Sequence, residues 1–157
     1  TARMPQGVRE PLRVIVDSRG RTPLQAGVLT NPARALIVTT SAMPPSRTRE
    51  YSLKGVEVME VPAVGGQVDL RELLGALGQR GITSVLAEGG GSLLGSLFDL
   101  GLVDKTVAFI APIVIGGKEA VTPVAGRGVE SVSEALRLKR VRMERFGDDI
   151  MVVGYTG

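Results

Sequence analysis

The chain has 157 residues, of which 43% are hydrophobic and 22% charged, a composition typical of one folded domain. It contains no cysteine and no histidine, which excludes disulfides, the usual zinc sites, a thiolate nucleophile and imidazole acid–base catalysis. A net charge of +3 and an aromatic content of 3% argue against a stacking platform for nucleic acid. No apolar run is long enough to span a membrane. We therefore expect a cytoplasmic protein with neither nucleic-acid nor membrane partners.

The N-terminal half has the pattern of three strands and one helix. A loop is expected up to residue 11, and because the chain begins with Thr1 we expect it to be a piece of a longer protein. Strands are predicted where β-branched or alternating apolar residues recur, over residues 12–17, 35–40 and 55–61. A loop around Pro44 and Pro45 closes the second strand. Asp69 is the expected N-cap of a helix with a leucine stripe.

The C-terminal half predicts two further strands, a helix and a hairpin. Residues 83–87 and 103–111 read as strands, and residues 92–100 as a helix between them. A loop-rich segment follows, before a hairpin of residues 138–146 and 150–155. Five basic residues are expected on its edge strand, where charge discourages pairing between molecules: Arg137, Lys139, Arg140, Arg142 and Arg145. The alternation predicts an α/β fold, with a mixed, mainly parallel sheet, flanking helices and a C-terminal antiparallel hairpin.

The strongest local signal is TSVLAEGGGSLLGSL, residues 83–97, which reads as strand, glycine turn and helix. Glycines let the backbone approach an anion, and a helix N-terminus attracts phosphate. Glu88 ends the predicted strand, where open α/β sheets place ligands. Leu94 occupies the third glycine position of the dinucleotide fingerprint, so that motif is absent. A tight turn with a solvated glutamate is an equal alternative from spacing alone.

A second signal follows the first strand, in the residues VDSRGRTP. Ser18 and Arg19 offer a hydroxyl and a guanidinium, groups suited to a phosphate monoester such as the 2′-phosphate of NADPH. The alternative is a solvated turn with basic residues.

Four segments together resemble a known family. They are PLRVIVDSRGRTPL (11–24), ALIVTT (35–40), GVEVMEVP (55–62) and the long segment 68–117, which includes AEGGGSLLGSL and GLVDKTVAFIAPIVIGG. They are similar to the reductase half of the bifunctional riboflavin-biosynthesis deaminase/reductase. The resemblance implies a dihydrofolate-reductase-like fold and NADPH-dependent reduction of 5-amino-6-(5-phosphoribosylamino)uracil, from the ribosyl to the ribityl form. It also implies a homodimer.

The resemblance assigns roles to individual residues. It implies that Arg3 and Glu88 contact the phosphorylated pyrimidine substrate. It implies a cofactor-binding set that comprises Ser18, Gly90, Gly91, Ser92, Leu93, Leu94, Gly95 and Ser96. Arg19 joins this set because of its guanidinium, as argued above for the 2′-phosphate. Gly89–Gly90 corresponds to a peptide that is cis in the related dihydrofolate reductases. No catalytic residue and no metal ligand are assigned.

The resemblance also implies what residues 1–157 lack. We expect a single reductase domain without the zinc deaminase domain and without the first part of the family's reductase domain. Such a chain would lack a central strand, and alone as a monomer it should show no turnover. Two alternatives follow: an incomplete fragment that serves as a structural or dimerisation module, and a related reductase acting on the diaminopyrimidinone precursor.

Overall fold

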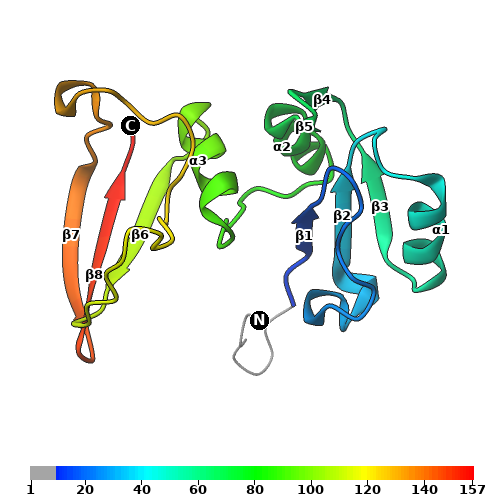
Figure 1. Cartoon of the computed structure of the whole chain (residues 1–157), viewed down its shortest axis with the longest axis horizontal. Helices are drawn as coiled ribbons and strands as arrows, with labels where there is room; N and C mark the ends of the chain where they lie inside the picture. Colours follow the sequence, from blue (N-terminus) through cyan, green and yellow to red (C-terminus); the bar gives the residue numbers. More distant parts are fainter. Residues whose placement is uncertain (1–9) are drawn as a thin grey trace. The chain divides into compact units, whose positions relative to one another are not determined.

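The computed structural model describes residues 10–157, which fall into two compact units, residues 10–83 and Ser84–Gly157. The first unit is built on a parallel sheet of β1 (Arg13–Val16), β2 (Ala35–Thr39) and β3 (Glu57–Glu60), in the order β1-β2-β3 (Figure 1). Two short 3-10 turns, Gly27–Leu29 and Pro32–Arg34, precede β2. The first three predicted strands are confirmed. In the described part of the chain, no helix is long and apolar enough to cross a lipid bilayer.

The core of this unit lies around the central strand β2. All five of its residues are buried, and Leu36, Ile37 and Val38 are wholly shielded from solvent. Burying an aliphatic side chain of this size contributes about 1.5–3 kcal/mol. Among residues 10–157, the buried apolar side chains all lie between Leu29 and Leu77.

Helix α1 (Pro45–Leu53) corrects the predicted loop around Pro44 and Pro45. Pro45 occupies the first turn, where a missing N–H costs nothing and the fixed φ suits a helix. The sequence PSRTREYSL has no apolar stripe, and Tyr51 is the only residue of this helix that is buried. Without that periodicity, sequence reasoning had no signal for a helix.

A two-stranded hairpin, β4 (Ala63–Val64) and β5 (Gln67–Val68), leads directly into α2 (Leu70–Gln79). The Asp69 carboxylate accepts hydrogen bonds from the backbone N–H groups of Arg71 and Glu72, so the predicted N-cap is confirmed. Three leucines of the predicted stripe, Leu70, Leu73 and Leu77, are buried, and the fourth, Leu74, is half-buried.

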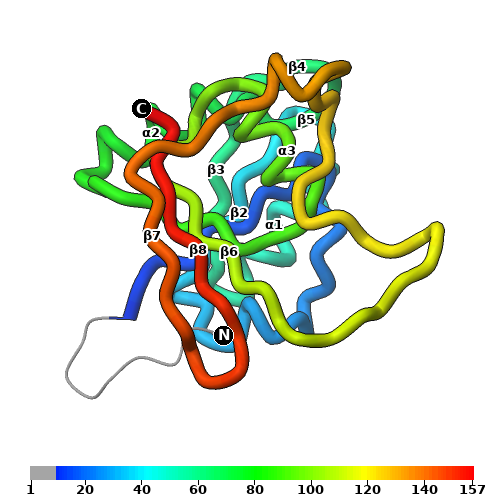
Figure 2. Tube along the Cα trace, turned by 90° about the vertical axis from the view of Figure 1, so that its left-hand side faces the viewer, coloured from blue at the N-terminus to red at the C-terminus, as the bar shows by residue number. Residues whose placement is uncertain are grey.

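The second unit combines α3 (Gly91–Asp99) with an antiparallel sheet. Its strands are β6 (Lys105–Ile110), β7 (Lys139–Phe146) and β8 (Asp149–Tyr155), in the order β6-β8-β7. A short 3-10 turn, Val132–Glu134, lies between β6 and β7. Figure 2 shows β7 and β8 running side by side to the tight turn that joins them. The predicted C-terminal antiparallel hairpin is confirmed, with its basic strand β7 at the sheet edge.

Two expectations for the segment before α3 are wrong. Residues 83–87 form no strand, and their apolar side chains are exposed, with Val85 at 52% and Leu86 at 79%. An apolar run becomes a strand only when a neighbouring strand accepts its backbone hydrogen bonds, and no described residue does so here. The Gly89–Gly90 peptide is trans, as is every other peptide bond in the described residues.

Candidate functional site

The turn of residues 17–22, directly after β1, is organised by a buried carboxylate. Asp17 Oδ2 accepts hydrogen bonds from the backbone N–H of Thr22 at 2.6 Å and from its hydroxyl at 2.7 Å. Burial raises the pKa of Asp17, but hydrogen bonds from Arg21, Thr22 and Arg19 outweigh it and hold the pKa below its ordinary value. The ionised carboxylate therefore fixes the shape of the 17–22 turn.

Ser18 is buried and its hydroxyl is already engaged. Its Oγ donates to Gln67 Oε1 at 3.1 Å and accepts from the backbone N–H of Val68 at 3.0 Å. The Ser18 carbonyl accepts from the Thr40 hydroxyl at 2.9 Å. A hydroxyl carries one proton, so Ser18 contacts a phosphate only when that proton turns away from Gln67.

Arg19 is exposed on the same turn. One terminal nitrogen of its guanidinium lies 4.0 Å from the position that a Cβ on Gly66 would occupy. The Arg19 side chain therefore extends along the turn between β4 and β5. Among the described residues, it makes no hydrogen bond or ion pair, so its N–H donors are available to an anion.

Two residues of α1 hold the 17–22 turn from outside. Arg47 Nε donates to the Gly20 carbonyl at 2.9 Å, and Arg47 Nη2 donates to the Thr22 carbonyl at 2.6 Å. The Tyr51 hydroxyl donates to the same Thr22 carbonyl at 2.7 Å. Burial raises the pKa of Tyr51, so its proton stays in place. Sequence reasoning missed both residues because it read this segment as a loop.

The glycine turn, Glu88–Gly91, leads into α3 as the sequence predicted. Gly90 has φ 49° and ψ 127°, a conformation that side-chain-bearing residues rarely adopt. No side chain caps the helix, and in the described residues nothing accepts from the N–H groups of Gly91, Ser92 or Leu93. These donors and the exposed Glu88 carboxylate can bind a ligand. The donor set suits the pyrophosphate of a dinucleotide.

The glycines inside α3 have a packing role that the sequence did not indicate. A Cβ on Gly91 would lie 2.6 Å from the Thr122 carbonyl oxygen, and a Cβ on Gly95 only 2.0 Å from that of Ala125. The Ala125 N–H also donates to the Gly91 carbonyl at 3.0 Å. Residues 122–127 therefore pack directly on this helix face. Gly95 is buried beneath them, and this close packing accounts for a glycine at position 95 without any contact to a cofactor.

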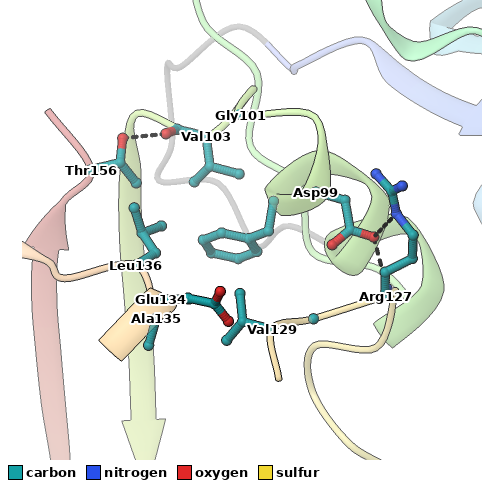
Figure 3. Close-up of a pocket in the computed structure, with 11 residues that line it drawn as sticks. Asp99, Gly101, Val103, Arg127, Val129, Glu134, Ala135, Leu136 and Thr156 are labelled. Carbon is teal, nitrogen blue, oxygen red and sulfur yellow. Dashed lines mark hydrogen bonds and ion pairs between the residues drawn. The ribbon is translucent and has the colours of Figure 1, made fainter. Parts of the chain in front are cut away.

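A hollow of about 770 Å³ lies at the other end of α3, beside Phe98 and Asp99 (Figure 3). The Asp99 carboxylate accepts a hydrogen bond from the Arg127 backbone N–H at 2.8 Å and lies 4.0 Å from its guanidinium. Val129 and Leu136 contribute apolar walls. Of the sequence-predicted site residues that lie within residues 10–157, none lines this hollow.

The predicted residues thus fall on two turns. Ser18 and Arg19 share the 17–22 turn of the first unit. Glu88 and the segment Gly90–Ser96 share the glycine turn and the first turns of α3 in the second unit. Arg3 lies outside the described residues.

Comparison with known proteins identifies the family. The model of the RibD C-terminal domain matches residues 1–152. The riboflavin biosynthesis protein RibD of Actinobacillus pleuropneumoniae is 35% identical over 152 residues, which cover 96% of this chain and 40% of that protein. The 2,5-diamino-6-ribosylamino-4(3H)-pyrimidinone 5′-phosphate reductase of Methanothermobacter thermautotrophicus is 40% identical over 146 residues, 93% of this chain and 66% of that protein.

Comparison with solved structures supports the same family. Acinetobacter baumannii RibD, form 2, matches with a TM-score of 0.82 at 27% identity, over 99% of this chain and 42% of that chain. The chain belongs to the RibD C-terminal domain family, and the resemblance seen in the sequence is confirmed together with its α/β fold class. It spans 40% and 66% of the length of the two curated relatives.

Proposed function

We propose that the chain is the NADPH-dependent reductase that converts 5-amino-6-(5-phosphoribosylamino)uracil to its ribityl form in riboflavin biosynthesis. The observation that carries the proposal is the family match over residues 1–152, which includes the glycine turn with Glu88. A chain without histidine or cysteine suits a reaction whose difficult step is supplied by a cofactor.

The two turns provide groups that fit the anionic parts of NADPH. On this proposal the Arg19 guanidinium, with Ser18, recognises the 2′-phosphate, and the segment Gly90–Ser96 binds the pyrophosphate through its open N–H groups. NADPH, when bound, supplies the hydride that the sugar carbon accepts. Glu88 orients the substrate, and Arg3 binds its phosphate.

A second substrate is supported by a specific relative. The Methanothermobacter reductase, 40% identical, is named for the 2,5-diaminopyrimidinone, which carries an amino group where the uracil carries an oxygen. One compound offers a hydrogen-bond donor at that position and the other an acceptor. A site that favours one of these groups should reduce one compound more efficiently than the other. An assay in which the two compounds compete for the same protein measures this difference.

The test is to measure turnover by the purified chain with each compound. The readouts are the consumption of NADPH and the identification of the ribityl product. We expect NADPH oxidation by the homodimer only when a pyrimidine substrate is present, with little activity from NADH, and no turnover by the monomer. The Glu88→Gln variant should keep its affinity for NADPH and lose affinity for the substrate. A chain that binds NADPH and neither pyrimidine would be a structural module of the family. Light scattering would test the expected homodimer.

Arg19 gives the sharpest test of the cofactor assignment. A charge-assisted hydrogen bond contributes about 1.5–3 kcal/mol, so Arg19→Ala should weaken NADPH binding roughly tenfold or more. NADH lacks the 2′-phosphate, and its affinity should hardly change. Titration calorimetry with both dinucleotides measures the two effects. Equal losses would show that Arg19 does not recognise the 2′-phosphate.

A further inference from the structure

Four of the five N–H donors of the Arg47 guanidinium are committed within the protein. Besides the carbonyls of Gly20 and Thr22, Arg47 donates to the Tyr51 hydroxyl at 2.8 Å and to the Glu50 carboxylate. Its guanidinium carbon also lies 4.7 Å from the centre of the Tyr51 ring, within range of a cation–π interaction. A guanidinium engaged in this way is poorly placed to bind a ligand anion, so its effect passes through the groups that it holds.

The backbone is held on both sides of Arg19, by Arg47 after it and through Asp17 before it. Gly20 and Thr22 accept from Arg47, while Asp17 accepts from Thr22 on the opposite side of the turn. Gly20 has φ +68°, and a Cβ there would lie 2.5 Å from the sulfur of Met43. The 17–22 turn is thus enclosed by a carboxylate, a guanidinium and a buried methionine, and the exposed side chain of Arg19 projects from a rigid base.

We propose that Arg47 is a positioning residue that sets the preference of this chain for NADPH over NADH. This inference rests on the proposed function, in which Arg19 recognises the 2′-phosphate. Arg47 holds the carbonyls of residues 20 and 22, and the Tyr51 hydroxyl supports the second of them. The backbone from which Arg19 projects is then already fixed before the cofactor binds, which lowers the entropy lost on binding.

The experiment compares Arg47→Met with Arg49→Met in the full chain. Both variants remove one positive charge from α1 and keep a long apolar side chain, but Arg49 is exposed and does not hold the turn. NADPH and NADH affinities are measured for each by titration calorimetry. We expect Arg47→Met to lower the ratio of NADPH to NADH affinity roughly tenfold and Arg49→Met to leave it close to wild type. Arg47→Lys should behave like Arg47→Met, because an ammonium cannot reproduce the fork.

A second measurement reports the turn without any cofactor. Hydrogen exchange of the peptide covering residues 17–24 should become faster in Arg47→Met and stay unchanged in Arg49→Met. Tyr51→Phe removes one support of the Thr22 carbonyl and should produce smaller changes in the same direction; it serves as the main variant if Arg47→Met does not fold.

The outcomes separate the two proposals. Equal losses of NADPH and NADH affinity would show a purely structural role for Arg47 and overturn the inference. Normal NADPH preference in a folded Arg47→Met protein, or unchanged exchange over residues 17–24, would overturn it as well. A wild-type chain that binds neither dinucleotide would instead refute the proposed function, and this inference with it.

Discussion

Replacing a glycine by alanine should have opposite effects on stability in α2 and in α3. A Cβ on Gly75 of α2 would meet no atom within 4 Å, whereas a Cβ on Gly95 of α3 would meet the Ala125 carbonyl oxygen at 2.0 Å. Alanine is the better helix former by about 0.8–1 kcal/mol. At Gly75 that gain is realised, but at Gly95 a backbone atom must move to admit the methyl group.

We therefore expect Gly75→Ala to raise the free energy of unfolding by about 0.5–1 kcal/mol and Gly95→Ala to lower it. Urea denaturation of both variants and the wild type measures the two changes. Because the chemical substitution is the same in both helices, each variant is the control for the other. A gain of stability in Gly95→Ala would mean that residues 122–127 do not pack on α3.

The depressed pKa of Asp17 makes stability depend on pH in a defined direction. A carboxyl group whose pKa is lower in the folded than in the unfolded state stabilises the fold above the unfolded value and loses this contribution as the pH falls through the folded value. Asp17→Asn should therefore be less stable than the wild type at neutral pH. The difference should shrink as the pH falls below 3.8, the ordinary value for this group. Denaturation at a series of pH values tests this, and a constant difference would contradict it.

Helix α2 depends on its cap. The Asp69 carboxylate satisfies N–H groups that have no partner within the helix, at 2.9 Å for Arg71 and 3.3 Å for Glu72. Asp69→Ala should lower the free energy of unfolding by about 1 kcal/mol, while Asp69→Asn, which keeps an acceptor oxygen, should cost less. Thermal and urea unfolding compare the two. Equal losses would show that charge rather than hydrogen bonding carries the effect.

The elements differ in how far the sequence could predict them, and the reason is physical. Helix α2 has both an N-cap and a buried leucine stripe, so local residues determine it. Helix α1 buries only Tyr51, and its role is visible only once Arg47 and Tyr51 lie beside the 17–22 turn. Residues 83–87 have strand-forming side chains, but a strand also needs a partner, which local sequence does not supply.

The candidate site, too, could be predicted from the sequence only in part. The positions of Arg19 on a turn and of Gly90 before a helix followed from local patterns, since each depends on its immediate neighbours. The bond between Ser18 and Gln67, and the contact of Gly95 with Ala125, join residues far apart in the sequence. Pairings of this kind arise from tertiary packing and leave no periodic signal in one chain.

At the scale of the whole molecule, apolar burial is unevenly distributed. Strand β2 is entirely buried, whereas Phe109 and Ile110 of β6 are each 57% exposed. Local opening costs most where apolar contacts are densest. We expect the amides of residues 35–39 to exchange hydrogen far more slowly than those of residues 105–110. Exchange mass spectrometry measures both, and equal protection would show that β6 is buried in solution.

The two tyrosines make the protein its own optical probe. The chain has no tryptophan, so its intrinsic emission comes from Tyr51 and Tyr155 alone. They lie in different units, and each has its own surroundings: Tyr51 is wholly buried, and Tyr155 packs against Arg140, whose guanidinium is 4.3 Å from the ring centre. Replacing either tyrosine by phenylalanine leaves a single emitter. The melting of each unit can then be followed separately by fluorescence, with no attached dye.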